Sequence, residues 1–123
     1  MKVLIIDDNK DITEVVKFYC DSKNIECDVV TDSKDGLSSI RSGKYDLILL
    51  DMAMPVFSGI DILTTLKAEK LVDRMNIVVF TASSDPKMYE AIKEIGIKEI
   101  LKKPCGVDDL ENVMKKYCNI NSA

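Results

Sequence analysis

The chain has 123 residues, 46% of them hydrophobic and 31% charged, which suits a globular domain rather than a disordered or fibrous chain. Its formal net charge of −4 argues against sequence-independent nucleic-acid binding, which needs a basic surface. The sequence contains no histidine, so mixed Cys/His zinc sites and nucleophiles activated by histidine are excluded.

The chain shows no sign of an export signal or a membrane span. The opening MKVLII is too short for the core of a signal peptide, and no apolar run approaches the length that crosses a bilayer. The four cysteines, Cys20, Cys27, Cys105 and Cys118, contain no C-x-x-C pair. We interpret them as mostly reduced core residues and expect a cytoplasmic protein.

Strand-like and helix-like patterns alternate along the chain. Continuous aliphatic and β-branched runs predict strands buried on both faces, whereas a half-polar fifth run predicts a strand at the sheet edge. Apolar residues at helical spacing predict a helix after each strand. The expected strands are residues 2–6, 25–30, 45–51, 76–83 and 97–101, and the expected helices are residues 11–22, 33–43, 58–70, 85–96 and 106–119.

The helical segments carry start and stop signals. Ser33 is expected to cap the second helix, Pro86 occupies a first-turn position of the fourth, and Gly96 ends it. Apolar spacing also predicts which side of each helix faces the core. The inner faces of the first and last helices are expected to consist of Ile12, Val15, Val16, Tyr19 and Cys20, and of Val107, Leu110, Val113, Met114 and Tyr117.

This βα pattern, repeated five times, predicts a single α/β domain. Short connections and right-handed crossovers leave mainly one arrangement, a doubly wound five-stranded parallel sheet with helices on both faces. We expect one domain over residues 1–123, with 119–123 as a frayed tail, and find no linker, repeat or second domain.

Polar side chains follow four of the five expected strands at their carboxyl ends. Asp7 and Asp8 follow the first strand, Asp51 ends the third, Thr81 ends the fourth and Lys103 follows the fifth. Each has an ordinary explanation as a turn residue, a helix cap or a solvated charge. Those explanations do not account for their gathering at the edge where open parallel sheets bind ligands.

The chemistry of these residues suggests phosphoryl transfer. Three converging carboxylates would repel one another, and a divalent cation with oxygen ligands, Mg²⁺ above all, would relieve that repulsion. A lysine and a threonine hydroxyl could then neutralise and hydrogen-bond a phosphate, and an aspartate could act as the nucleophile.

With these motifs in place, the chain resembles the response regulator receiver domains of two-component signalling, of the single-domain CheY-like kind. The resemblance spans essentially all 123 residues and is carried by the DD pair, LLDMAMPVFSG around Asp51, FTAS around Thr81 and KKP around Lys103. It implies a flavodoxin-like strand order of 2-1-3-4-5.

The resemblance also implies a role for each site residue. Asp51 would accept a phosphoryl group from the phosphohistidine of a separate kinase or phosphotransfer protein. Asp8 would coordinate Mg²⁺ directly, Asp7 largely through a water molecule, and Ala53 through its backbone carbonyl. Lys103 would pair with the phosphoryl oxygens, and Thr81 would move to hydrogen-bond them. Pro55 and Gly59 match the turn after the acceptor strand, and Pro104 matches the family's cis-proline position.

Three positions depart from the family pattern or tune it. Ile100 stands where many receivers have an aromatic residue that swings inward with the threonine, so the usual switch is in doubt. Cys105 replaces a larger apolar residue and is interpreted as packing. Ala53 and Ser83 occupy the positions that tune dephosphorylation, and because Ala53 cannot orient an attacking water, we predict slow self-dephosphorylation.

The expected output is a conformational change that alters protein–protein contacts, without nucleic-acid or membrane binding, in a monomer or weak dimer. By family analogy the docking face would include Tyr89, Lys93, Lys98 and Lys102, which an ordinary solvated surface also explains. The chain could instead be a phosphorelay intermediate or a receiver cut from a larger regulator.

Other function classes are less well supported. An aspartate-nucleophile phosphatase would need an acid two residues after its nucleophile, and the sequence has Ala53 after Asp51 and Asn9 after Asp7. An unphosphorylated scaffold would lack part of the acidic site. A flavin-binding domain would need a phosphate-binding Ser/Thr/Gly loop that is missing here.

Overall fold

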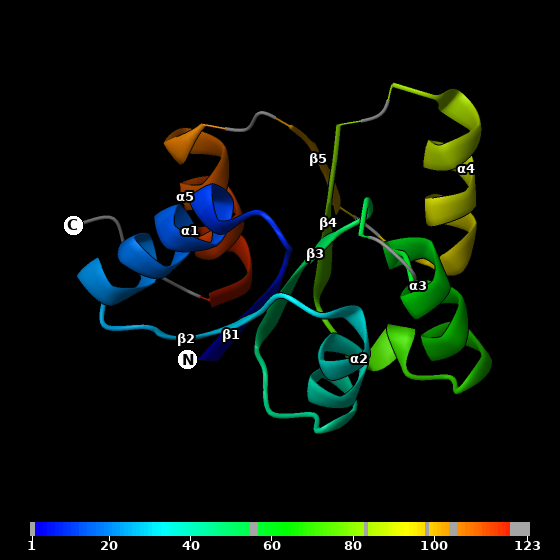
Figure 1. Cartoon of the computed structure of the whole chain (residues 1–123), viewed down its shortest axis with the longest axis horizontal. Coiled ribbons are helices and arrows are strands. Elements are labelled where there is room, and N and C mark those ends of the chain that lie inside the picture. Colours follow the sequence, from blue (N-terminus) through cyan, green and yellow to red (C-terminus); the bar gives the residue numbers. More distant parts are fainter. Residues whose placement is uncertain (1, 55–56, 83, 98, 104–105, 119–123) are drawn as a thin grey trace.

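The computed structural model describes residues 2–54, 57–82, 84–97, 99–103 and 106–118, and within them the predicted doubly wound α/β fold is confirmed. All strands run parallel in the order β2-β1-β3-β4-β5, so each crossover returns the chain to the end of the sheet at which the strands begin (Figure 1). The elements are β1 (Lys2–Ile6), α1 (Lys10–Ser22), β2 (Glu26–Val30), α2 (Ser33–Arg41), β3 (Leu47–Asp51), α3 (Gly59–Ala68), the 3-10 helix η1 (Val72–Arg74), β4 (Ile77–Thr81), α4 (Pro86–Ile95), β5 (Glu99–Lys102) and α5 (Val107–Cys118).

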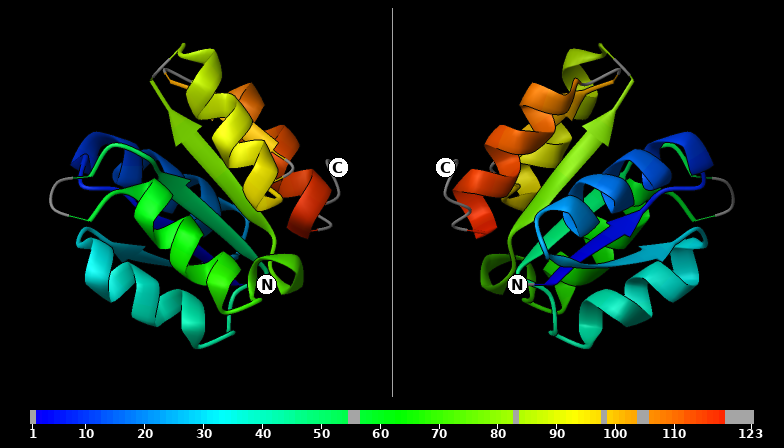
Figure 2. Two further views of the ribbon diagram at one scale, coloured as in Figure 1. Left: turned by 90° about the vertical axis from the view of Figure 1, so that its right-hand side faces the viewer. Right: turned by 90° about the vertical axis from the view of Figure 1, so that its left-hand side faces the viewer.

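The sheet separates two apolar cores, one beneath α1 and α5 and the other beneath α2, α3 and α4 (Figure 2). In β1, Val3 and Ile5 face the first core, whereas Leu4 and Ile6 face the second, and all four are fully buried. Such two-sided burial is why the central strands are continuous apolar runs. None of the helices in the described ranges is long and apolar enough to span a membrane.

Two details of the helices differ from expectation. The cap of α2 is Asp32 rather than Ser33, because the Asp32 carboxylate accepts a hydrogen bond from the backbone N–H of Asp35 at 3.2 Å, while Ser33 is already helical. Val15 of α1 and Val107 of α5 were placed on inner faces but are 52% and 59% exposed. Val107 is the first residue of α5, whereas Val15 lies within α1 between the buried Thr13 and Val16, on the exposed flank of the inner face.

The predicted core placement of the cysteines is confirmed for the three that the structure describes. Cys20, Cys27 and Cys118 are free and buried, and all three lie in the core beneath α1 and α5. Cys105 lies outside the described residues.

The connection from β3 to α3 requires a glycine. The Gly59 N–H donates to the Met52 carbonyl at 3.2 Å, which draws the start of α3 against the end of β3. A Cβ atom on Gly59 would lie 2.6 Å from the Asp51 carbonyl oxygen and 2.7 Å from Met52 Cα, so backbone would have to move. A capping box between Ser58 and Asp61 fixes the same helix start.

Gly59→Ala is therefore expected to lower the free energy of unfolding by about 2 kcal/mol or more, because overpacking against backbone outweighs the usual helical preference for alanine. Urea unfolding measures the change. Gly106→Ala is the matched control, because a Cβ there meets nothing within 4 Å. Equal stability of the Gly59→Ala variant and the wild type would contradict this packing account.

Candidate functional site

The structure brings the predicted polar residues together at the carboxyl edge of the sheet. Asp7 and Asp8 follow β1, Asp51 is the last residue of β3, Thr81 is the last residue of β4, and Lys103 follows β5. Carboxylate oxygens of Asp7, Asp8 and Asp51 lie within 4.8 Å of one another, and these three could share a metal ion.

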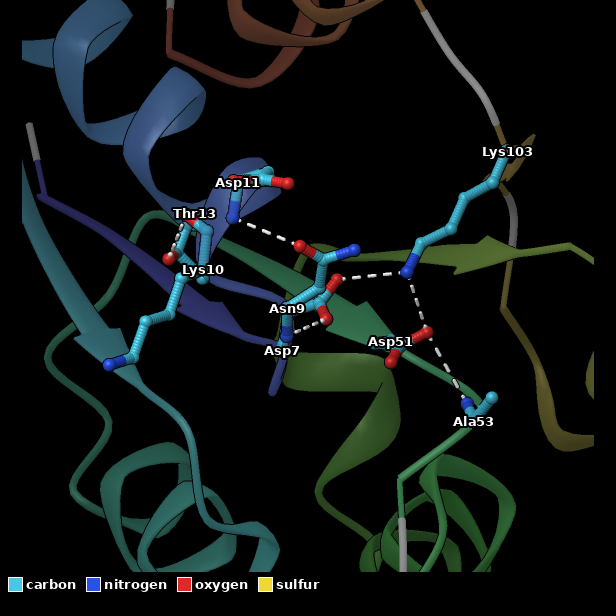
Figure 3. Close-up of polar contacts among 8 residues, drawn as sticks. All are labelled: Asp7, Asn9, Lys10, Asp11, Thr13, Asp51, Ala53 and Lys103. Carbon is cyan, nitrogen blue, oxygen red and sulfur yellow. Dashed lines mark hydrogen bonds and ion pairs between the residues drawn. The ribbon is translucent and has the colours of Figure 1, made fainter.

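Lys103 joins two of these carboxylates. Its Nζ atom lies 3.0 Å from Asp7 Oδ2 and 3.0 Å from Asp51 Oδ1, so one ammonium group bridges β1 and β3 (Figure 3). The Lys103 side chain is only 17% exposed. Its backbone N–H donates to the Thr81 carbonyl at 2.7 Å, which extends the β4–β5 pairing and directs the chain toward the site.

Asp7 is held in an unfavourable environment for its charge. It is fully buried, and burial raises the pKa of its carboxyl above the usual value. Hydrogen bonds from the Asn9 N–H, at 2.9 Å, and from Lys103 act in the opposite direction, while the neighbouring Asp51 raises the pKa further. The site would therefore be stabilised by additional positive charge.

Lys103 stays positively charged despite its position. Burial acts to lower its pKa, but the hydrogen bonds to Asp7 and Asp51 outweigh burial, so the pKa of Lys103 is raised above its usual value. A permanent cation is thus fixed beside the Asp51 carboxylate at neutral pH.

The Asp51 carboxylate is buried, and its hydrogen bonds with Lys103 and Ala53 fall on one of its two oxygens. The residue is 3% exposed, and its Oδ1 atom accepts hydrogen bonds from Lys103 and from the Ala53 N–H at 3.3 Å. No dashed line joins Oδ2 to the residues drawn in Figure 3. This second oxygen is suited to attack an incoming electrophile.

Asn9 and Met88 are two site neighbours to which the sequence analysis assigned no role in the site, although apolar spacing predicts Met88 on the inner face of the fourth helix, where it packs against the core. Asn9 caps α1 through its side chain, which accepts from the Asp11 N–H at 2.9 Å, while its own N–H holds Asp7. An asparagine just before a helical pattern is the signal that could have identified the cap. Met88 of α4 accepts a hydrogen bond from the Thr81 hydroxyl, with 3.6 Å between Oγ1 and Sδ.

A surface cavity of about 660 Å³ opens beside the site between α1 and α5. Its polar and charged lining residues are Asn9, Asp11 and Lys103, and the exposed Val15 and Val107 are among its apolar ones. The apolar spacing that suggested core positions for these two valines therefore marks an accessible apolar surface in the cavity that Lys103 also lines.

Five positions to which the sequence analysis gave a role lie outside the described residues. Their roles, and the roles of the described site residues in phosphorylation and metal binding, stay predictions. The positions are Pro55, Ser83, Lys98, Pro104 and Cys105.

The chain matches the family model of the response regulator receiver domain over residues 3–115. Among curated relatives, the transcriptional regulatory protein DltR of Streptococcus agalactiae is 31% identical over 112 residues, which cover 89% of this chain and 48% of that protein. Sporulation initiation phosphotransferase F of Bacillus subtilis is 26% identical over 121 residues, which cover 98% of this chain and 96% of that protein.

The solved structures agree with this match. The crystal structure of a two-component response regulator from Clostridium difficile aligns with a TM-score of 0.84 and 25% identity, covering all of this chain and 99% of that one. The chain spans about half the length of DltR and of the response regulator ArlR of Staphylococcus saprophyticus. With five parallel strands in the predicted order and the family model matched over most of its length, the chain belongs to the response regulator receiver domains, the phosphoacceptor signalling domains of two-component systems.

Proposed function

We propose that Asp51 is the residue of this receiver domain that accepts the phosphoryl group. The observation that carries the proposal is the Lys103 ammonium group, 3.0 Å from the buried Asp51 carboxylate and 3.0 Å from Asp7. A nucleophilic carboxylate beside a fixed cation is what transfer of a phosphoryl group requires, because negative charge accumulates on the phosphoryl oxygens.

Receiver domains take phosphate from histidine kinases or phosphotransfer proteins, and this chain has no histidine of its own to serve as donor. In the proposed reaction, Asp51 Oδ2 attacks phosphorus, the P–N bond to the donor histidine breaks, and the bonding electrons leave with the imidazole. The Lys103 ammonium group pairs with the phosphoryl oxygens and orients them.

Mg²⁺ fits the donor set at this edge. Receiver domains bind Mg²⁺ at an acidic pocket, and here Asp7, Asp8 and Asp51 supply oxygen ligands close together, one of them buried with a raised pKa. We assign Asp8 as a direct ligand, Asp7 as a ligand largely through water, and the Ala53 carbonyl as a further ligand. When bound, the ion would neutralise the phosphoryl oxygens and offset the repulsion among the carboxylates.

The output we propose is a changed protein contact at the face formed by α4, β5 and α5. Lys93 and Lys102 are exposed there and Tyr89 is half-buried. Lys102 Nζ also donates to Ser84 Oγ at 2.6 Å, so β5 is tied to the segment between β4 and α4. A shift of that segment would therefore reach the lysines of this face.

A second candidate function is that of a phosphorelay intermediate, which passes its phosphoryl group to another protein. The observation in its favour is that the match to sporulation initiation phosphotransferase F covers 96% of that relative. The match to DltR, by contrast, covers 48% and is consistent with a receiver that belongs to a longer regulator.

Incubation with acetyl phosphate and Mg²⁺ tests the acceptor directly. We expect the intact mass of the wild type to rise by one phosphoryl group, and we expect no rise without Mg²⁺ or in Asp51→Asn, because the nucleophile is then missing. Asp35→Asn is the control, since it removes an exposed carboxylate of α2. Phosphorylation of Asp51→Asn to the wild-type level would contradict the assignment.

Asp7→Asn is expected to raise the melting temperature of the metal-free protein by about 3 °C, because it removes a buried carboxylate whose charge is disfavoured. Since the folded-state pKa of Asp7 is raised, the wild type gains protons on folding, and the difference should shrink as the pH falls through that pKa. Differential scanning fluorimetry measures both effects.

With added Mg²⁺, the wild type should have a higher melting temperature than Asp7→Asn, because Mg²⁺ stabilises the wild type and has little effect on the variant. Asp73→Asn, which alters an exposed carboxylate of η1 far from the site, should respond to Mg²⁺ as the wild type does. If Asp7→Asn still gained the full stabilisation by Mg²⁺, that result would count against Asp7 as part of the metal site.

Ala53→Asn is expected to shorten the half-life of the phosphorylated protein about tenfold, because Ala53 is exposed beside the acceptor and offers no group to orient water. Loss of the phosphoryl mass over time measures the rate. A wild-type half-life of a few seconds, or no change in the variant, would show that this position does not limit hydrolysis.

A further inference from the structure

The Thr81 hydroxyl is joined to α4 through a sulfur atom. Thr81 is the last residue of β4 and is 3% exposed, and its Oγ1 atom donates to Met88 Sδ at 3.6 Å. Sulfur is a weak acceptor with a long contact distance, so this hydrogen bond can be exchanged for a stronger one. It connects the acceptor edge of the sheet with the first turns of the following helix.

The residue at position 100 cannot make a similar connection. Ile100 pairs with Val79 in the β4–β5 register, is half-buried and packs against the core beneath α2, α3 and α4. Its aliphatic side chain has no hydrogen-bonding group. Met88 packs against the same core as Ile100 and also accepts the hydrogen bond from Thr81, so a change in either contact can move its side chain.

Helix α4 is lightly anchored, which makes it suited to move. Ile92 is its one buried residue, whereas α3, of the same length, buries four. A further attachment of α4 is the hydrogen bond from Lys67 Nζ to the Glu94 carbonyl, at 2.7 Å, near its carboxyl end. The first two turns of α4, residues 86–91, contain Met88 and bury none of their residues, so this part of the helix is suited to local movement.

We propose that Met88 is a positioning residue that holds the Thr81 hydroxyl in the unphosphorylated state, and that phosphorylation releases it. The inference rests on the proposed role of Asp51 as acceptor. The charged phosphoryl oxygens on Asp51 are stronger acceptors than a thioether, so the Thr81 hydroxyl exchanges Met88 Sδ for a phosphoryl oxygen. The released Met88 lets the start of α4 shift, and the shift reaches Tyr89, the next residue, on the proposed docking face.

The proposal fixes the sign of a measurable effect. Because the hydroxyl has to leave Met88 before it can reach the phosphoryl group, the contact with Met88 lowers the affinity of the resting protein for a phosphoryl group or its analogue. Removing the sulfur while keeping the volume, as in Met88→Leu, should therefore tighten binding of beryllofluoride with Mg²⁺ about two- to fivefold.

The experiment is a double-mutant cycle with beryllofluoride and Mg²⁺ as the probe, measured by calorimetry. The variants are Met88→Leu, Thr81→Val and the double variant; valine keeps the shape of threonine without its hydroxyl. Met88→Leu should tighten binding in the wild-type background and have no effect in the Thr81→Val background. Met75→Leu is the matched control, because Met75 packs against the same core at the opposite edge of the sheet and should leave binding unchanged.

A second measurement examines the contact without any ligand. In methyl NMR spectra of the unphosphorylated protein, Thr81→Val should shift the Met88 methyl resonance and leave that of Met75 in place. The methyl spectra need no phosphoryl analogue, so they test the contact between Thr81 and Met88 even in a variant that no longer binds beryllofluoride.

The outcomes separate this inference from the proposed function. Failure of wild-type protein to bind beryllofluoride would overturn the acceptor role of Asp51 and the inference with it. Two results would overturn the inference while leaving the role of Asp51 intact. In the first, the wild type binds beryllofluoride and Met88→Leu does not change its affinity. In the second, Met88→Leu changes the affinity equally in the wild-type and Thr81→Val backgrounds. An unshifted Met88 methyl resonance in Thr81→Val would do the same.

Discussion

The contact on which the site depends is the one between the Lys103 ammonium group and the buried carboxylates of Asp7 and Asp51. Two buried like charges on neighbouring strands would push β1 and β3 apart, and a single cation placed between them turns that repulsion into a link. The link also fixes where β5 ends, because Lys103 follows that strand directly. The carboxyl ends of three strands are thereby held together at the edge where the chemistry is proposed.

The site is arranged for function at some cost in stability. Asp7 has no exposure to water and a raised pKa, so its charge is tolerated rather than favoured in the metal-free protein. Close packing next to Asp51 likewise leaves room for nothing larger than glycine at position 59. Such unfavourable features are expected where a chain is organised around a ligand or a transferred group. They explain why binding of a cation and a phosphoryl group would stabilise this edge.

The sequence predicted the parts of the site that lie at strand ends. Parallel strands with apolar runs place Asp7, Asp51 and Lys103 at one edge whatever the details of the loops, so their convergence follows from topology alone. The same reasoning failed at the rim of the core. Apolar spacing cannot distinguish a covered position from an exposed one at a helix end or on the flank of an inner face, and Val107 and Val15 were therefore misplaced.

Contacts that depend on loop conformation were also beyond the sequence. The Thr81–Met88 hydrogen bond joins residues seven apart across the turn into α4, and no pattern of apolar spacing predicts which side chain lies over a strand end. The cap at Asp32 was missed because three adjacent residues, Thr31, Asp32 and Ser33, can all cap a helix, and the local backbone decides among them.

The most direct test of the account is a chemical map of the phosphorylated residue. After phosphorylation with acetyl phosphate and Mg²⁺, borohydride reduction converts an acyl phosphate to an alcohol, and peptide mass spectrometry then locates the modified side chain. The account predicts a single modified residue, Asp51. Modification at Asp7 or Asp8 in its place, or a phosphoryl group that resists reduction because it is attached to a hydroxyl such as that of Thr81, would contradict the account.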